Sequence, residues 1–92
     1  MPTRWFMRRW EEVRGDQFSS WGAGTYYFEV GDDGWPTRQI EVYDSGPVLR
    51  YGPDHPEDEY GQLSQAKLDE IEDWSPWAIA AMDFEAAWSA DR

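Results

Sequence analysis

The sequence contains no cysteine and no asparagine, and it has a single lysine and a single histidine. Without cysteine, disulfides, zinc–thiolate centres and thiol nucleophiles are excluded. Small secreted domains often depend on disulfides, so this absence favours a cytoplasmic protein. No run of about 18 apolar residues is present, so no membrane-spanning helix is expected. The opening segment MPTRWFMRRW also lacks the apolar stretch of a signal peptide, so none is expected.

Aromatic residues are abundant for a chain of this length. The 92 residues include seven Trp, five Tyr and four Phe. Disordered chains are poor in aromatics, so this composition indicates a folded protein in spite of its high charge. The length suits one domain, and we expect residues 1–92 to form it.

Charge is distributed unevenly along the chain, which carries a net charge of −11. Residues 1–52 hold eight acidic and six basic side chains, whereas residues 53–92 hold eleven acidic and two basic ones. Binding to nucleic acid needs a basic patch that displaces counterions from phosphates, and the acidic half cannot provide one. Anionic membrane surfaces are disfavoured for the same reason. A protein partner with a basic surface is the natural complement.

Four strands are predicted, over residues 4–13, 25–30, 37–44 and 48–51. The first is expected near a sheet edge. In the third, Ile40 and Val42 alternate with Gln39, Glu41 and Tyr43, which indicates one face on the core and one face in water. The turn Asp44–Pro47 then leads into the fourth strand. Short turns between successive strands favour a meander.

The pattern becomes helical after residue 62. A loop over 52–62, rich in proline, glycine and charge, separates the two parts. Apolar residues three apart predict a helix over 65–74, and an alanine-rich segment predicts another over 77–90, starting either at Ser75 or near residues 80–82. Strands followed by helices predict an α+β fold: an antiparallel three- to four-stranded meander sheet with two C-terminal helices packed on one face.

Several segments resemble a family of small bacterial proteins catalogued as domain of unknown function 6881. The similar segments are Trp10, YYFEV (26–30), RQIEVYDSG (38–46), LRYG (49–52), the apolar residues of the predicted helix 65–74, and DFEAAW (83–88). The resemblance implies the fold described above and, because such families often lie beside bacterial toxins, an immunity role. Three departures are the long segment 14–24, the weak alternation of the first strand, and Ala80, which stands where a helix-capping Ser is expected. The resemblance supplies no catalytic residues.

No pattern of residues points to catalysis. His55 is followed by Glu57, Asp58 and Glu59, but a lone histidine lacks the ligand spacing of a preformed metal site. The sequence contains no nucleophile elbow and no phosphate-binding glycine loop. We therefore expect neither a cofactor nor a metal, and no enzymatic activity, although a chance pair of carboxylates among nineteen acidic residues keeps hydrolase chemistry as a residual alternative.

Acidic and aromatic side chains of the second half are the best candidates for partner binding. Carboxylates crowded on one helix face repel one another and weaken the helix, and a basic partner would offset this repulsion on binding. A solvated acidic face would show the same pattern. Trp35 and three tyrosines are candidate aromatic anchors of such an interface. The candidate partner-binding residues are Glu57, Asp58, Glu59, Tyr60, Asp69, Glu72, Asp73, Glu41, Tyr43 and Tyr51.

These observations favour a cytoplasmic protein-binding module: a bacterial immunity protein that occludes the basic active site of a cognate toxin, such as a nuclease. Two alternatives stay open. A nucleic-acid mimic would use the same acidity against a DNA-binding protein, and a small-ligand binder would enclose an apolar pocket among its aromatics. An edge strand could also pair two copies into a homodimer.

Overall fold

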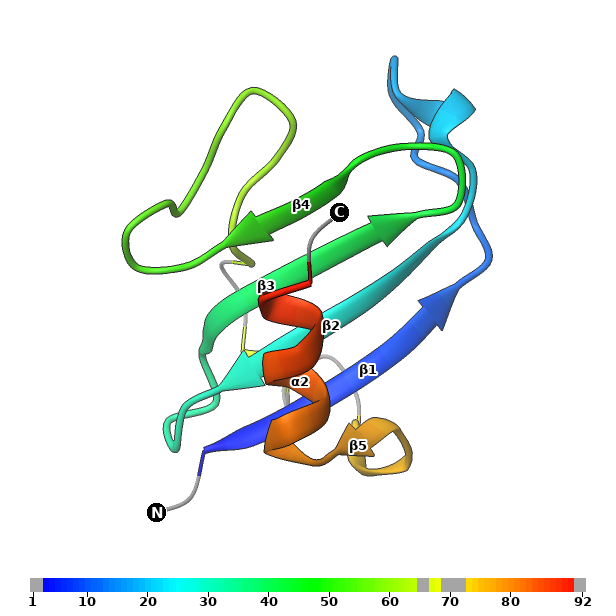
Figure 1. Ribbon diagram of the computed structural model, residues 1–92. Helices are drawn as coiled ribbons and strands as arrows, with labels where there is room; N and C mark the ends of the chain where they lie inside the picture. Colours follow the sequence, from blue (N-terminus) through cyan, green and yellow to red (C-terminus); the bar gives the residue numbers. More distant parts are fainter. Residues whose placement is uncertain (1–2, 65–66, 69–72, 91–92) are drawn as a thin grey trace.

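The structure, a computed structural model, describes residues 3–64, 67–68 and 73–90. It confirms the α+β class and the antiparallel sheet, but the sheet has five strands in the order β4-β3-β2-β1-β5 (Figure 1). The elements are β1 (Arg4–Trp10), η1 (Ser19–Trp21), β2 (Gly24–Val30), β3 (Pro36–Tyr43), β4 (Val48–Tyr51), η2 (Ser75–Trp77), β5 (Ala78–Ile79) and α2 (Ala81–Trp88).

The sheet register assigns each side chain to one of two faces. Phe6 pairs with Phe28, Phe28 with Gln39, and Gln39 with Tyr51, so these four side chains lie in one row across the sheet. Because successive residues of a strand point to opposite sides, the next row along lies on the other face. It crosses the sheet through Tyr27, Ile40 and Arg50.

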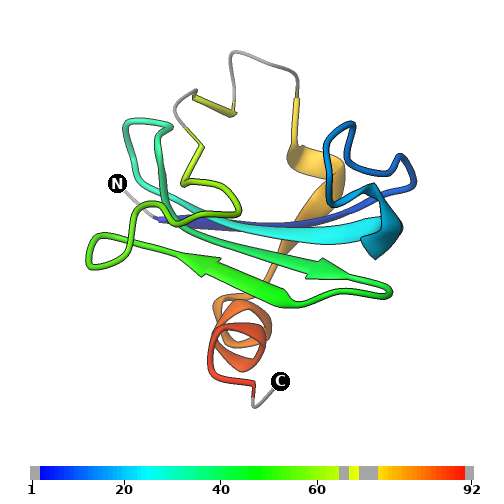
Figure 2. The same cartoon turned by 90° about the horizontal axis from the view of Figure 1, so that it is seen from above.

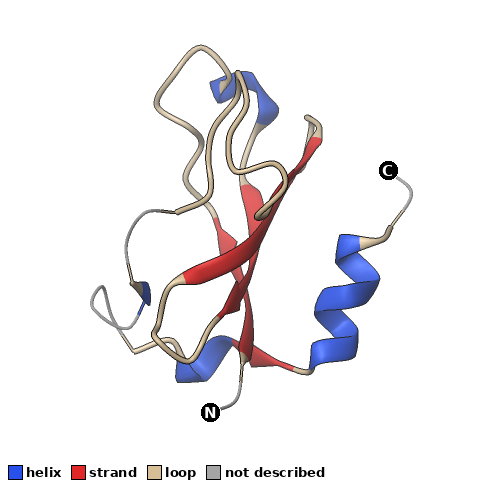
Figure 3. Ribbon diagram, turned by 90° about the vertical axis from the view of Figure 1, so that its left-hand side faces the viewer, coloured by secondary structure: helices blue, strands red, loops and turns tan. Residues whose placement is uncertain are grey.

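Each face of the sheet has its own cover. Helix α2 packs on the face that carries Ile40, and the long loops cover the opposite face (Figures 2 and 3). Beneath the loops lie two clusters of buried apolar side chains. One consists of Phe6, Phe28, Val30, Leu68 and Trp74, and the other of Tyr43, Leu49 and Tyr51. The sheet is therefore a middle layer with packed side chains on both sides.

One arginine fastens α2 to the sheet. The Arg38 guanidinium lies 4.9 Å from the ring centres of both Phe84 and Trp88. It also pairs with Glu29 at 2.5 Å and with Glu85 of the helix. The hydrogen bonds that Glu29 accepts from Arg38, and also from Thr37 and Trp5, hold its pKa at about 2, well below its ordinary value. The contacts fix the helix in the absence of a side-chain cap, since Ala80 stands at its N-terminus.

Several predicted boundaries differ from those observed. The first strand ends at Trp10 instead of residue 13, where exposed charged residues follow. The segment predicted as a helix over 77–90 contains β5, which pairs with Trp5 and Phe6. That pairing satisfies backbone groups at a sheet edge. Of the two predicted starts, the one near residues 80–82 is confirmed, since α2 begins at Ala81. Most of the predicted helix 65–74 lies outside the described residues, and no described helix is long and apolar enough to cross a membrane.

Candidate protein-binding site

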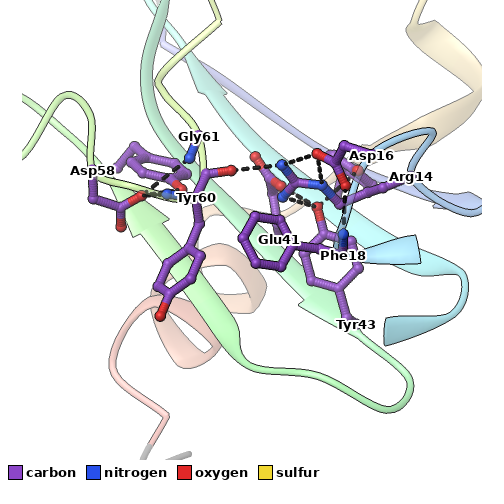
Figure 4. A network of polar contacts seen from close by, with 10 residues as sticks. Arg14, Asp16, Phe18, Glu41, Tyr43, Asp58, Tyr60 and Gly61 are labelled. Atoms are coloured by element: carbon purple, nitrogen blue, oxygen red, sulfur yellow. Dashed lines mark hydrogen bonds and ion pairs between the residues drawn. The ribbon is translucent and has the colours of Figure 1, made fainter. Parts of the chain in front are cut away.

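The loop over residues 53–64 is held in one shape by Asp58. Its Oδ1 accepts hydrogen bonds from the backbone N–H of Tyr60 at 2.8 Å and of Gly61 at 3.1 Å, and from the Tyr51 hydroxyl at 2.9 Å (Figure 4). Burial alone would raise the pKa of Asp58, but these donors outweigh it and lower the pKa. Two isolated bridges, Gly52 to His55 and Glu57 to Gln62, close the loop on itself. Asp58, whose side chain is 24% exposed, therefore supports the loop through its acceptor oxygens.

The two neighbouring carboxylates behave differently from Asp58. Glu57 and Glu59 are exposed, and neither forms an ion pair or side-chain hydrogen bond with another described residue. Tyr60 is half-buried and rests edge-on against Phe18 and Trp21, with ring centres 5.3 and 5.5 Å away. The loop thus presents two unpaired negative charges on a hydrogen-bonded frame.

The predicted wet face of β3 is buried, which corrects the sequence interpretation. Gln39, Glu41 and Tyr43 are only 4%, 7% and 2% exposed. The Glu41 carboxylate accepts hydrogen bonds from the Tyr43 hydroxyl and from Gln39 Nε2, the latter at 2.7 Å. Burial, together with the hydrogen bond to Glu41, raises the pKa of Tyr43. A buried polar group that finds partners avoids the cost of desolvation, so these residues belong to the interior.

This buried network also positions the loop. Gln39 Oε1 accepts a hydrogen bond from the Ser64 backbone N–H at 2.8 Å, and its Nε2 donates to the Gln62 carbonyl at 3.3 Å. Tyr51, fully buried on β4, reaches Asp58 from below. The candidates Glu41, Tyr43 and Tyr51 are therefore not accessible to a partner, and they hold the loop to the sheet.

Arg14 supports the candidate site, a role that the sequence pattern did not reveal. Its Nη2 donates to the Tyr60 carbonyl at 2.6 Å and to Asp16 at 2.7 Å, and its Nη1 donates to the Tyr43 hydroxyl at 3.4 Å (Figure 4). It joins the 11–23 connection, the sheet and the loop. The available signal was Asp16, whose side chain accepts from the Phe18 N–H at 2.9 Å and so makes a local turn in a segment read only as a long connection.

The remaining candidates fall into separate places. Asp73 is exposed, and its Oδ1 accepts from the N–H and hydroxyl of Ser75 at 3.0 and 2.6 Å, which lowers its pKa. Asp73 thus holds the start of the η2 turn. Asp69 and Glu72 lie outside the described residues. Trp35, in the turn between β2 and β3, is 42% exposed.

His55 lies against Tyr51 and Asp58, which support the loop. Its ring stacks parallel to Tyr51 with ring centres 6.1 Å apart, and its Nε2 is 3.4 Å from Asp58 Oδ2. In the described part of the chain, no group of three or more His, Cys, Asp or Glu side chains is placed to hold a metal ion. His55 therefore contacts the residues that support the loop, although 59% of its side chain is exposed.

The site therefore consists of an acidic loop, a buried network that supports it, and an exposed tryptophan beside it. Comparison of the chain with protein-family models, with curated proteins and with solved structures found no match.

Proposed function

We propose that this protein is a small acidic binding module whose partner presents a basic protein surface. The observation that carries the proposal is the contrast within the loop, where Asp58 is held inward by its donors while Glu57 and Glu59 point outward unpaired. Unpaired carboxylates on a fixed frame attract a basic surface over distance and need little ordering when it docks.

The function in the cell that we propose is immunity against a toxin. A cognate toxin such as a nuclease binds its anionic substrate through lysine and arginine side chains. A protein with a net charge of −11 and a projecting acidic loop can cover such a surface and exclude the substrate. The resemblance of several sequence segments to bacterial domain of unknown function 6881 implies the same role. We propose that the protein acts in the cytoplasm.

The test is co-expression with the proteins encoded by the adjacent genes. We expect one neighbour to be toxic when expressed alone, to be tolerated together with this protein, and to co-purify with it as a stable complex. If no neighbour is toxic and none binds, the immunity proposal is wrong. Competition by duplex DNA for the same partner separates this function from that of a nucleic-acid mimic with a broad set of DNA-binding targets.

A second candidate function rests on an apolar pocket on the loop-covered face. The pocket has a volume of about 240 Å³ and is lined by Trp10, Tyr26, Phe28 and Trp74. Its walls are aromatic, as expected of a site for a small apolar ligand. Saturable binding of an apolar aromatic probe such as indole, lost in Trp10→Ala, would favour this function; failure of indole to bind would exclude it for ligands of that class.

A further inference from the structure

A groove lies between the acidic loop and the turn that joins β2 to β3. Its volume is about 250 Å³. Trp35 and Pro36 form one wall, and the base of the loop forms the other. The residues that line the groove are Trp35, Pro36, Pro56, Glu57, Gln62, Leu63 and Ser64. This volume is below the roughly 300–1,000 Å³ of sites for drug-sized ligands, and it suits a single long side chain.

Both walls of the groove are fixed by hydrogen bonds. The Trp35 N–H donates to Asp33 Oδ1 at 3.0 Å, and the Trp35 carbonyl accepts from the Gly31 N–H at 3.0 Å. Gly34 supports this turn with a φ of 88°, a conformation that favours glycine. On the opposite wall, the Leu63 N–H donates to the Pro56 carbonyl at 2.8 Å. The groove is therefore formed before any partner binds, which reduces the ordering cost of docking.

We infer that this groove receives an arginine side chain of the basic partner. The inference deepens the proposed function and rests on it for the identity of the partner. A guanidinium can stack flat on the exposed face of Trp35 while its N–H groups pair with the Glu57 carboxylate. A lysine ammonium matches the charge but not the planar, forked geometry. An apolar side chain would bury Glu57 without a partner, and an acidic side chain would be repelled by it.

A second exposed tryptophan provides an internal contrast. Trp10 is 39% exposed and Trp35 is 42% exposed, and each lines a pocket of similar volume. Their ionic neighbours differ. Arg8 lies 4.5 Å from the Trp10 ring centre and also stacks on Trp74 and Trp77, and both basic and acidic side chains line a pocket beside Trp10. The described residues that line the groove at Trp35 include Glu57 but no arginine or lysine, so a guanidinium from a partner would find a carboxylate there and no cation already on the ring.

The direct experiment uses a capped Gly-Arg-Gly peptide titrated into ¹⁵N-labelled protein. We expect a saturable shift of the Trp35 indole N–H signal, with at least threefold weaker binding for Gly-Lys-Gly and no saturable shift for the isosteric, neutral Gly-citrulline-Gly. Glu57→Gln should weaken the arginine peptide at least threefold. Glu12→Gln removes the same charge at an exposed position outside the groove and should leave binding unchanged. An unmoved Trp35 signal, equal shifts for the citrulline peptide, or an equal loss in Glu12→Gln would overturn the inference.

The partner complex gives a second readout that separates the two proposals. Trp35→Ala should reduce affinity for the partner at least tenfold. The control is Met82→Ala, which truncates an exposed apolar side chain that does not line the groove. If Glu57→Lys with Glu59→Lys weakens the complex while Trp35→Ala and Glu57→Gln do not, the acidic docking surface stands and the arginine groove is wrong. If the arginine peptide binds at Trp35 but no neighbouring gene encodes a partner, the groove stands and the immunity proposal is wrong.

Discussion

Three arginines in or next to the sheet and the carboxylates of the acidic loop have opposite roles. Arg9, Arg14 and Arg38 each pair with acidic side chains of the same chain, so their charge is consumed in holding elements together. Glu57 and Glu59 form no such pair with another described residue. The loop therefore presents unpaired negative charge to the solvent, whereas these three arginines form ion pairs within the protein. A substitution should accordingly affect stability at Arg14 and Arg38, whose side chains are largely buried, and binding at the loop.

The largest effect on stability is expected at Arg38. Arg38→Leu leaves Glu29, 15% exposed, without its cation and removes the tie to α2. We expect a loss of about 2–4 kcal/mol in the free energy of unfolding, because one side of a largely buried pair is removed. Chemical denaturation measures it. Arg9→Leu is the control, since Arg9 and Asp44 are 41% and 51% exposed and such pairs contribute little. Equal losses in both variants would contradict the conclusion that Arg38 stabilises the fold through its largely buried ion pair.

Acid should remove part of the same stabilisation. The pKa of Glu29 is about 2 in the folded protein, below its ordinary value of 4.5. A carboxyl with a depressed folded pKa contributes its stability above the unfolded pKa and loses it as pH falls towards the folded one. We expect the unfolding free energy to fall between pH 4.5 and about 2. Glu29→Gln should flatten the curve in that window, and an unchanged slope in that variant would argue against Glu29 as its source.

A smaller effect is expected at the support of the loop. Asp58→Ala removes an acceptor shared by two backbone N–H groups and the Tyr51 hydroxyl. We expect a loss of about 1–2 kcal/mol in unfolding free energy and faster amide exchange at Tyr60 and Gly61. Native-state hydrogen exchange measures the second effect. If protection at these amides is the same in wild type and variant, Asp58 does not hold the loop.

The smallest effect on stability is expected at the outward carboxylates. Glu57→Gln and Glu59→Gln change exposed side chains that pair with no other described residue. Surface changes of this kind usually shift unfolding free energy by less than about 0.5 kcal/mol. Thermal unfolding of Glu57→Gln, Glu59→Gln and Asp58→Ala under the same conditions compares their losses of stability. A loss in either variant as large as that of Asp58→Ala would mean that these carboxylates also support the fold.

Much of the sheet could be predicted from the sequence because strand patterns are local. The expected strands 25–30, 37–44 and 48–51 lie within one residue of β2, β3 and β4. The role of the β3 face could not be predicted in this way. Alternation separates Gln39, Glu41 and Tyr43 from Ile40 and Val42, but it does not show that a loop covers the polar row and satisfies it through Ser64 and Gln62.

Contacts between distant segments explain the other differences. Strand β5 is two residues long and forms only through its pairing with β1, some seventy positions earlier, so an alanine-rich helical pattern concealed it. The role of Arg14 likewise depends on Tyr60 and Tyr43, neither of which is near it in sequence. In the loop, composition identified an acidic candidate site but could not separate the inward Asp58 from the outward Glu57 and Glu59.

The most direct test of the account is the rate at which this protein associates with the partner encoded beside it, measured by stopped flow over a range of salt concentrations. Glu57→Lys with Glu59→Lys should slow association about tenfold or more at low salt and flatten its salt dependence. Glu12→Lys with Asp83→Lys makes the same change in net charge at exposed positions outside the loop, and should have a much smaller effect. Equal rates for the two variants would contradict an acidic loop that docks the partner.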